Sequence, residues 1–107
     1  MPMLKFRGIS IDEVKKESKF LVDRLAEVID CPKDYFTLEM IESSYIFDGE
    51  FSPQPSMIEV SWFDRGQDVQ DVVAVILTEH FKKDRECLDV FFNKLNTNDY
   101  YENGEHF

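Results

Sequence analysis

The chain of 107 residues carries twenty-two acidic and twelve basic side chains, so its formal net charge is −10 at pH 7. This length predicts a single domain over residues 1–107, because it is too short for two independent hydrophobic cores. The negative charge would repel phosphate backbones and anionic lipids, and no run approaches the ~18 apolar residues of a membrane span, so we expect no nucleic acid, no membrane and a cytoplasmic location.

Residues 1–48 predict a first β-α-β unit. The stretch MLKFRGI alternates apolar and charged side chains, which is typical of a strand half-buried against helices. Ser10 and Glu13 match a capping box, and apolar residues spaced by three, four or seven predict a helix that runs to about Asp30. Pro32 would end this helix, and the alternating stretch FTLEMIES predicts the second strand.

Residues 55–107 repeat this plan after a segment, YIFDGEFSPQP, in which Asp48-Gly49 and two prolines indicate a turn or loop. MIEVSWF predicts the third strand, CLDVFFNKLN predicts the fourth, and NDYYENGEHF forms a polar, aromatic tail. A second helix lies between these strands, with Asp64 and Gln67 as its candidate caps. Its expected apolar stripe comprises Val69, Val72, Val73, Ile76 and Phe81.

The element order β-α-β-β-α-β predicts an α+β fold, in which two helices cover one face of a four-stranded sheet. This element order does not determine how the strands are arranged in the sheet. A ferredoxin-like module has the same element order, but it interleaves the strands of its two halves. The uncovered face would be polar but interrupted by Ile41, Phe63 and Phe91, so we expect it to contact another subunit or a ligand as well as water. The polar side chains expected there are Lys5, Arg7, Thr37, Glu39, Glu59, Ser61, Asp89 and Asn93.

The cysteines and histidines do not indicate a metal site or a disulfide. Cys31 and Cys87 are far apart in the sequence and have no Cys or His at a ligand spacing, and His80 and His106 are equally isolated. We therefore expect two reduced thiols, no metal and no cofactor.

Three stretches, MPMLKF, CPKDYFTLEMI and NDYYENGEHF, follow one another along nearly the whole chain. The first resembles a start with a catalytic amino-terminal proline, the second resembles a passage from helix to strand, and the third resembles an aromatic tail that contains asparagine. With the two β-α-β units, the chain is identified as a member of the tautomerase superfamily, which includes macrophage migration inhibitory factor, on a bacterial branch with no assigned activity. The resemblance implies a homotrimer whose sheets pair their edges around a central channel.

The resemblance also implies a catalytic role for Pro2. Removal of Met1 would leave Pro2 as a chain terminus with a secondary amine, and burial would lower the pKa of this amine below the ~7.7–8.0 of an ordinary α-amino group. The neutral amine would then take a proton from the carbon beside a carbonyl. Arg65 is the first candidate to bind a substrate carboxylate or enolate oxygen, and Arg7 is the second. The aromatic candidates to exclude water are Phe6, Trp62, Phe63 and Phe91.

Three departures from the family pattern keep the function open. Small tautomerases carry an arginine in the turn after the first strand, where this chain has Gly8-Ile9, and Asp64-Arg65-Gly66 in the second half matches that turn only approximately. Cys31 stands where relatives have a lysine, and Phe91 aligns with an asparagine of the last strand. The first hypothesis is a cofactor-independent tautomerase or isomerase that acts on a small carbonyl acid. The second is a trimer on the same fold that binds a ligand or partner without catalysis, and the third is a ferredoxin-like binding module.

Overall fold

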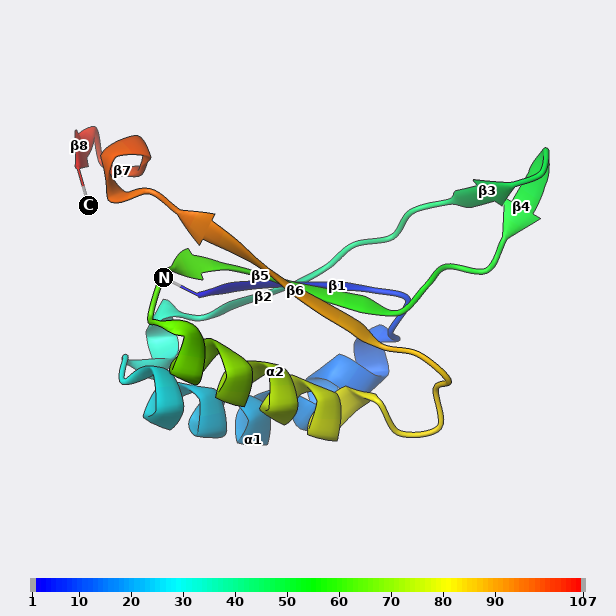
Figure 1. Ribbon diagram of the computed structural model, residues 1–107, viewed down its shortest axis with the longest axis horizontal. Coiled ribbons are helices and arrows are strands. Elements are labelled where there is room, and N and C mark those ends of the chain that lie inside the picture. The colour runs from blue at the N-terminus through cyan, green and yellow to red at the C-terminus, as the bar shows by residue number, and fades with distance from the viewer. Residues whose placement is uncertain (1, 107) are drawn as a thin grey trace.

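The computed structural model describes residues 2–106 and has two layers, a sheet and a pair of helices that cover one of its faces (Figure 1). The sheet consists of β1 (Met3–Arg7), β2 (Thr37–Met40), β5 (Met57–Phe63) and β6 (Asp89–Leu95), and the helices are α1 (Ile11–Ile29) and α2 (Gln67–Phe81). The smaller elements are the strands β3 (Tyr45–Phe47), β4 (Glu50–Ser52), β7 (Tyr101–Glu102) and β8 (Glu105–His106), and single 3-10 turns at Lys33–Tyr35 and Thr97–Asp99. The predicted α+β fold with two β-α-β units is confirmed.

The order of the strands in the sheet is β2-β1-β5-β6. Each half of the chain contributes one parallel pair, and β1 and β5 join the halves as antiparallel neighbours, with Lys5 opposite Glu59. A ferredoxin-like sheet would interleave the strands of the two halves, so that alternative is wrong. The outer strands, β2 and β6, are the edges of the sheet within a single chain.

Helix α1 begins and ends close to the predicted residues. The Ser10 hydroxyl accepts a hydrogen bond from the Glu13 backbone N–H at 3.2 Å, which satisfies a free donor of the first turn. At the other end Asp30 adopts a left-handed conformation, with φ at 61°, and its N–H bonds to the Ala26 carbonyl.

Helix α2 begins differently from the prediction. Its cap residue is Gly66, which supplies no side-chain hydrogen bond, and neither Asp64 nor Gln67 fills that role. The Asp64 carboxylate instead accepts a hydrogen bond from the Gly66 N–H at 2.9 Å, which closes a turn ahead of the helix. Val72, expected in the apolar stripe, is 45% exposed.

The hydrophobic core lies between the sheet and the helices. Leu4 and Phe6 of β1 are buried on the helix side, and the Phe6 ring meets the Phe81 ring of α2 edge to face, with the ring centroids 5.3 Å apart. The alternating strands place the predicted polar residues on the uncovered face, where Phe91 is 43% exposed. Charged and aromatic side chains therefore share that face, as the sequence predicts.

Two small hairpins project beyond the sheet at opposite ends of the molecule (Figure 1). The segment predicted as a turn or loop forms the β3–β4 hairpin, and Asp48 and Gly49 make its turn with positive φ values of 51° and 80°. Ile46, Phe47 and Phe51 on this hairpin are 72%, 77% and 84% exposed. The predicted polar tail contains the second hairpin, β7–β8.

Candidate active site

Pro2 lies at the head of β1, where the last residues of β5 pass beside it. Met3 is opposite Ser61 in this antiparallel pair, so the register continued by one residue places Pro2 opposite Trp62. The Pro2 carbonyl oxygen accepts a hydrogen bond from the backbone N–H of Thr37 on β2 at 3.2 Å. Its side chain is less than 2% exposed. Pro2 is therefore held between two strands and screened from solvent within a single chain.

Arg65 lies at the same end of the sheet, in the turn between β5 and α2. Its positive charge acts on Cys31, which lies just after α1. Burial raises the pKa of the Cys31 thiol, and the charge of Arg65 opposes this rise. Arg65 is exposed, and its guanidinium makes no hydrogen bond or ion pair with any of residues 2–106. This end of the sheet thus has an unpaired cation close to the end of α1.

Arg7 lies at the other end of β1. It is five positions along the extended strand from Pro2, a distance of about 16 Å at the usual rise of a strand. Its guanidinium is 3.5 Å from a carboxylate oxygen of Glu59, and both side chains are largely buried, with 23% and 15% exposed. A single chain therefore brings Pro2 and Arg65 to one end of the sheet and leaves Arg7 at the other.

The four aromatic candidates have different surroundings. Phe6 and Trp62 belong to the core, and the Trp62 ring is 5.1 Å from the Phe92 ring. Phe63 is half-buried against Tyr100 of the tail, with the ring centroids 5.4 Å apart. Of the four, Trp62 is the one that faces Pro2 across the β1–β5 ladder.

Two buried polar atoms near this end have no hydrogen-bond partner among residues 2–106. The first is the indole Nε1 of Trp62, a hydrogen-bond donor in a residue that is 1% exposed. The second is the side-chain oxygen Oε1 of Gln70, an acceptor near the start of α2. Buried polar atoms are normally hydrogen-bonded to protein or water, so at this end Trp62 has a donor and Gln70 an acceptor that no protein group satisfies. Nothing in the sequence marks these atoms, because pairing depends on how the side chains pack.

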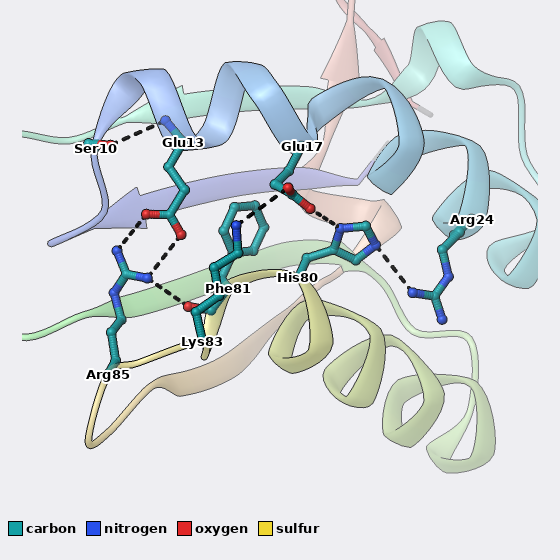
Figure 2. Close-up of polar contacts among 8 residues, drawn as sticks. All are labelled: Ser10, Glu13, Glu17, Arg24, His80, Phe81, Lys83 and Arg85. Atoms are coloured by element: carbon teal, nitrogen blue, oxygen red, sulfur yellow. Dashed lines mark hydrogen bonds and ion pairs between the residues drawn. The ribbon is translucent and has the colours of Figure 1, made fainter.

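A second set of polar contacts joins α1 to α2, and no sequence motif predicts it (Figure 2). His80 is 5% exposed; its Nδ1 is 2.7 Å from a Glu17 carboxylate oxygen and its Nε2 is 3.2 Å from the Arg24 guanidinium. Because a guanidinium only donates, Nε2 is the acceptor and Nδ1 carries the proton. The hydrogen bond from His80 lowers the pKa of Glu17.

Arg85 extends these contacts at the far end of the helices (Figure 2). It donates two hydrogen bonds to the Glu13 carboxylate, both at 2.9 Å, and one to the Phe81 carbonyl at 2.8 Å. These hydrogen bonds lower the pKa of Glu13 and raise that of Arg85. All their partners belong to the protein itself, so the cluster stabilises the fold.

Neither a metal site nor a membrane-spanning helix is present among residues 2–106. In the described part of the chain, no group of three or more His, Cys, Asp or Glu side chains is arranged to hold a metal ion. Neither helix within residues 2–106 is long and apolar enough to cross a bilayer. Cys31 and Cys87 are free thiols.

Comparison with protein families gives one match that covers nearly the whole chain. The family described as "Domain of unknown function (DUF1904)" matches residues 1–106. The crystal structure of a DUF1904 domain from Sebaldella termitidis ATCC 33386 has 38% sequence identity and a TM-score of 0.91, and the similarity covers 100% of both chains. Among curated protein sequences, none matches this chain.

More distant structures share the fold. A macrophage migration inhibitory factor homologue from Prochlorococcus marinus has 14% identity and a TM-score of 0.70, over 99% of this chain and 97% of that one. Pt0534, in a structure of the protein inactivated by 2-oxo-3-pentynoate, has 15% identity and a TM-score of 0.67, over 98% of this chain and 94% of that one. At these identities the similarity shows the tautomerase fold and nothing finer.

Proposed function

This chain belongs to the DUF1904 family and has the fold of the tautomerase superfamily, and we propose that it is a cofactor-independent tautomerase that moves a proton on a small carbonyl acid. The observation that carries the proposal is the burial of Pro2 at the head of β1, at the end of the sheet where Arg65 is an exposed, unpaired cation. Burial favours a neutral amine, which is the form that accepts a proton. Pro2 and Arg65 thus combine a base with a group that binds an anion.

The proposed reaction begins with removal of Met1, which lies outside the described residues. The neutral nitrogen of Pro2 takes a proton from the carbon beside the substrate carbonyl and becomes a cation. The electron pair of the broken C–H bond moves into an enolate, and the proton returns from Pro2 to the enolate oxygen. The net change is a keto acid converted to its enol, or the reverse, with no oxidant or cofactor.

Arg65 is the group that we assign to the substrate carboxylate or enolate oxygen. Its guanidinium has no competing partner among residues 2–106, and the amide groups at the start of α2 add positive potential near it. Arg7 is already paired with Glu59, so the proposal gives it no role at the Pro2 site of its own chain. Its predicted contact with substrate stays untested.

The substrate class is proposed from chemistry and from one structural neighbour. A carboxylate next to a carbonyl offers an anion for Arg65 and an acidified C–H bond for Pro2. Pt0534, which has the same fold, is inactivated by the 2-oxo acid 2-oxo-3-pentynoate. We therefore propose 2-oxo acids as the substrate class of this chain.

A homotrimer and a cytoplasmic location are also part of the proposal. Two observations support assembly: β2 and β6 are uncovered edge strands, and the β3–β4 hairpin exposes Ile46, Phe47 and Phe51. Edge pairing between three copies would cover the strands, and the hairpin would bury its apolar side chains on a neighbour.

A trimer without catalysis is the second candidate function. It is favoured by the same burial of Pro2, because a side chain less than 2% exposed leaves a substrate little access within one chain. The departures at Cys31 and Phe91 support it as well. In this case the scaffold would bind a ligand or partner, and the Pro2 nitrogen would have no chemical role.

Mass spectrometry and enzyme assays on the full-length chain test the two candidates. The mature amino terminus is determined first, and the processed protein is then incubated with 2-oxo-3-pentynoate and assayed with phenylpyruvate. A tautomerase would gain the mass of one inactivator on the peptide that begins with Pro2, and would lose its turnover in parallel. Pro2→Ala, which keeps a free amine but loses the rigid ring, should lower turnover at least tenfold.

Two results would remove Pro2 from the mechanism. One is turnover that Pro2→Ala leaves unchanged. The other is a processed protein that neither reacts with the inactivator nor turns over an enolisable 2-oxo acid, which would favour the non-catalytic trimer.

A further inference from the structure

We propose that the groove between α1 and α2 is a docking site for a basic amphipathic helix of a partner protein. The groove has a volume of about 470 Å³ and lies on the helix layer, between the C-terminal part of α1 and residues 71–79 of α2, whereas the uncovered face is the other side of the sheet. Its lining consists of Arg24, Glu27, Val28, Asp71, Val72, Val75, Ile76 and Glu79. The proposal is independent of catalysis at Pro2.

The floor of the groove is apolar and open to solvent. Val72 and Val75 of α2 are 45% and 55% exposed, although valine usually avoids water, and Val28 of α1 lies across from them. The α2 residues are three apart in the sequence, so they form one stripe along the helix. Two antiparallel helices with such stripes form a trough into which the ridge of a third helix fits.

The rim of the groove is acidic. Its three acids are Glu27, Asp71 and Glu79, and its one base, Arg24, already donates to Glu79 at 3.0 Å. No cation among residues 2–106 pairs with Glu27 or Asp71. The Asp71 carboxylate accepts a hydrogen bond from the neutral Gln67 amide at 2.7 Å. Two uncompensated negative charges therefore flank an apolar floor, which fits a partner with apolar side chains on one face and Lys or Arg beside them.

A neighbouring hollow extends the groove along the two helices. It shares Arg24 and Glu79 with the groove and adds Phe20, whose side chain is 63% exposed. Phe20, Arg24 and Val28 are spaced by four residues, so they lie on one face of α1. The Arg24–Glu79 ion pair lies between Phe20 and the valines, so the combined surface alternates apolar and charged side chains over several helical turns. A surface of this length suits an elongated, helical occupant better than a compact one.

A second copy of this chain fits the groove less well. Two such grooves face to face would oppose Glu27 and Asp71 to the same acids, and like charges brought together in an interface disfavour the complex. Pairing through the sheet edges or through the uncovered face would also leave the helix layer on the outside. The charge and the location both favour a different, basic partner.

Titration calorimetry with designed helical peptides tests the proposal on the full-length protein. The probe has leucines at i, i+3, i+4 and i+7 with flanking lysines, and the comparison peptide replaces every lysine with glutamate. We expect micromolar binding of the lysine peptide, at least tenfold weaker binding of the glutamate peptide, and weaker binding as salt is raised from about 50 to about 300 mM.

Three protein variants locate the binding site. Val75→Glu and Glu27→Lys should each weaken the lysine peptide at least tenfold. Ile11→Glu is the matched control, because Ile11 is an apolar residue of α1 with 59% exposure, close to the 55% of Val75, and lies outside the groove. It should bind as the unchanged protein does, and circular dichroism checks that all three variants remain folded.

The proposal is overturned by any of four results. These are no binding of the lysine peptide, equal binding of both peptides, unchanged binding by Val75→Glu, and equal loss of binding in Ile11→Glu. Sedimentation of Val75→Glu gives a fifth test: a smaller assembly than that of the unchanged protein would mean that a second copy covers the groove.

Discussion

Glu13 and Arg85 form a two-pronged ion pair, with both nitrogen–oxygen distances at 2.9 Å, although 72 residues separate them in the sequence. Arg85 also donates to the Ser56 hydroxyl at 3.1 Å, and Ser56 donates in turn to the Gly8 carbonyl at 2.9 Å. The first turn of α1, the loop after α2 and the start of β5 are thus joined by one chain of contacts. This cluster therefore stabilises the contact between the two β-α-β units.

Arg85→Lys should lower the free energy of unfolding by about 1–3 kcal/mol, because lysine keeps the charge but cannot form the two-pronged pair. Arg65→Lys is the matched control, since Arg65 is exposed and its guanidinium has no partner among residues 2–106. This control should change stability by less than about 0.5 kcal/mol. Urea unfolding followed by circular dichroism measures both, and equal effects would contradict the role given to the pair.

Stability should fall in acid because the native contacts lower the pKa of both Glu13 and Glu17. The hydrogen bond from Arg85 is the main cause for Glu13, and that from His80 is the main cause for Glu17. A carboxylate whose pKa is lower in the folded chain contributes stability that is fully present above its ordinary value, near 4.5, and is lost as pH falls through the folded value. Unfolding in urea between pH 7 and pH 3 should show this loss, with a smaller loss for Glu13→Gln.

The sequence predicts the parts of the fold that depend on local periodicity. Alternating residues in the first strand, the Ser10 cap and the helical spacing up to Asp30 each follow from short-range rules, and the structure has them in place. The resemblance to the tautomerase superfamily predicts the role of Pro2, and the position of Arg65 just before the second helix predicts its role in binding an anion. Pro2 and Arg65 lie at the same end of the sheet because β1 and β5 are antiparallel neighbours. The order of elements along the chain does not determine which strands are neighbours.

The features that the sequence does not reveal depend on contacts between distant residues. His80 is buried between Glu17 and Arg24, which lie 63 and 56 residues away, and no spacing rule connects them. Helical periodicity assigns Val72 to the core, yet its exposure depends on where α1 lies beside α2. The sequence predicts only a turn or loop at the β3–β4 hairpin, because Asp48-Gly49 and the prolines Pro53 and Pro55 just after β4 are typical of irregular segments.

Gly8→Ala should destabilise the protein by about 3 kcal/mol or more. Gly8 has φ at +69°, and an added Cβ would press on the Pro55 carbonyl oxygen and lie 2.8 Å from its carbon, both backbone atoms that cannot move aside. Gly49→Ala is the control, because Gly49 has φ at +80° but nothing within 4 Å of an added Cβ. It should cost about 1–2 kcal/mol from backbone strain alone. Thermal unfolding measures both variants. A similar loss of stability in Gly8→Ala and Gly49→Ala would show that the backbone around Pro55 moves away from the added Cβ.

Arg65→Gln should lower kcat/KM for an enolisable 2-oxo acid by about 10- to 100-fold, the usual effect of removing a charged contact to a developing anion. Arg7→Gln makes the same change at an arginine about 16 Å from Pro2, and it should alter kcat/KM by less than twofold. Steady-state assays of both variants compare the two candidates directly. A larger loss in Arg7→Gln would mean that a second protomer brings Arg7 to the site.

Phe51→Asp should reduce the proposed trimer to single chains, because Phe51 is 84% exposed on the β3–β4 hairpin beside the exposed Ile46 and Phe47, and a patch of exposed apolar side chains is typical of a contact surface. An aspartate there would place a charge in the contact between protomers, where it would lose its hydration without gaining a partner. Phe20→Asp is the matched control, since Phe20 is 63% exposed on α1, in the helix layer that sheet pairing leaves outside. Sedimentation equilibrium should give a trimer mass for Phe20→Asp and a monomer mass for Phe51→Asp. Trimers of both variants would show that the hairpin contributes nothing essential to assembly, and the uncovered edges of β2 and β6 would then carry the contact alone.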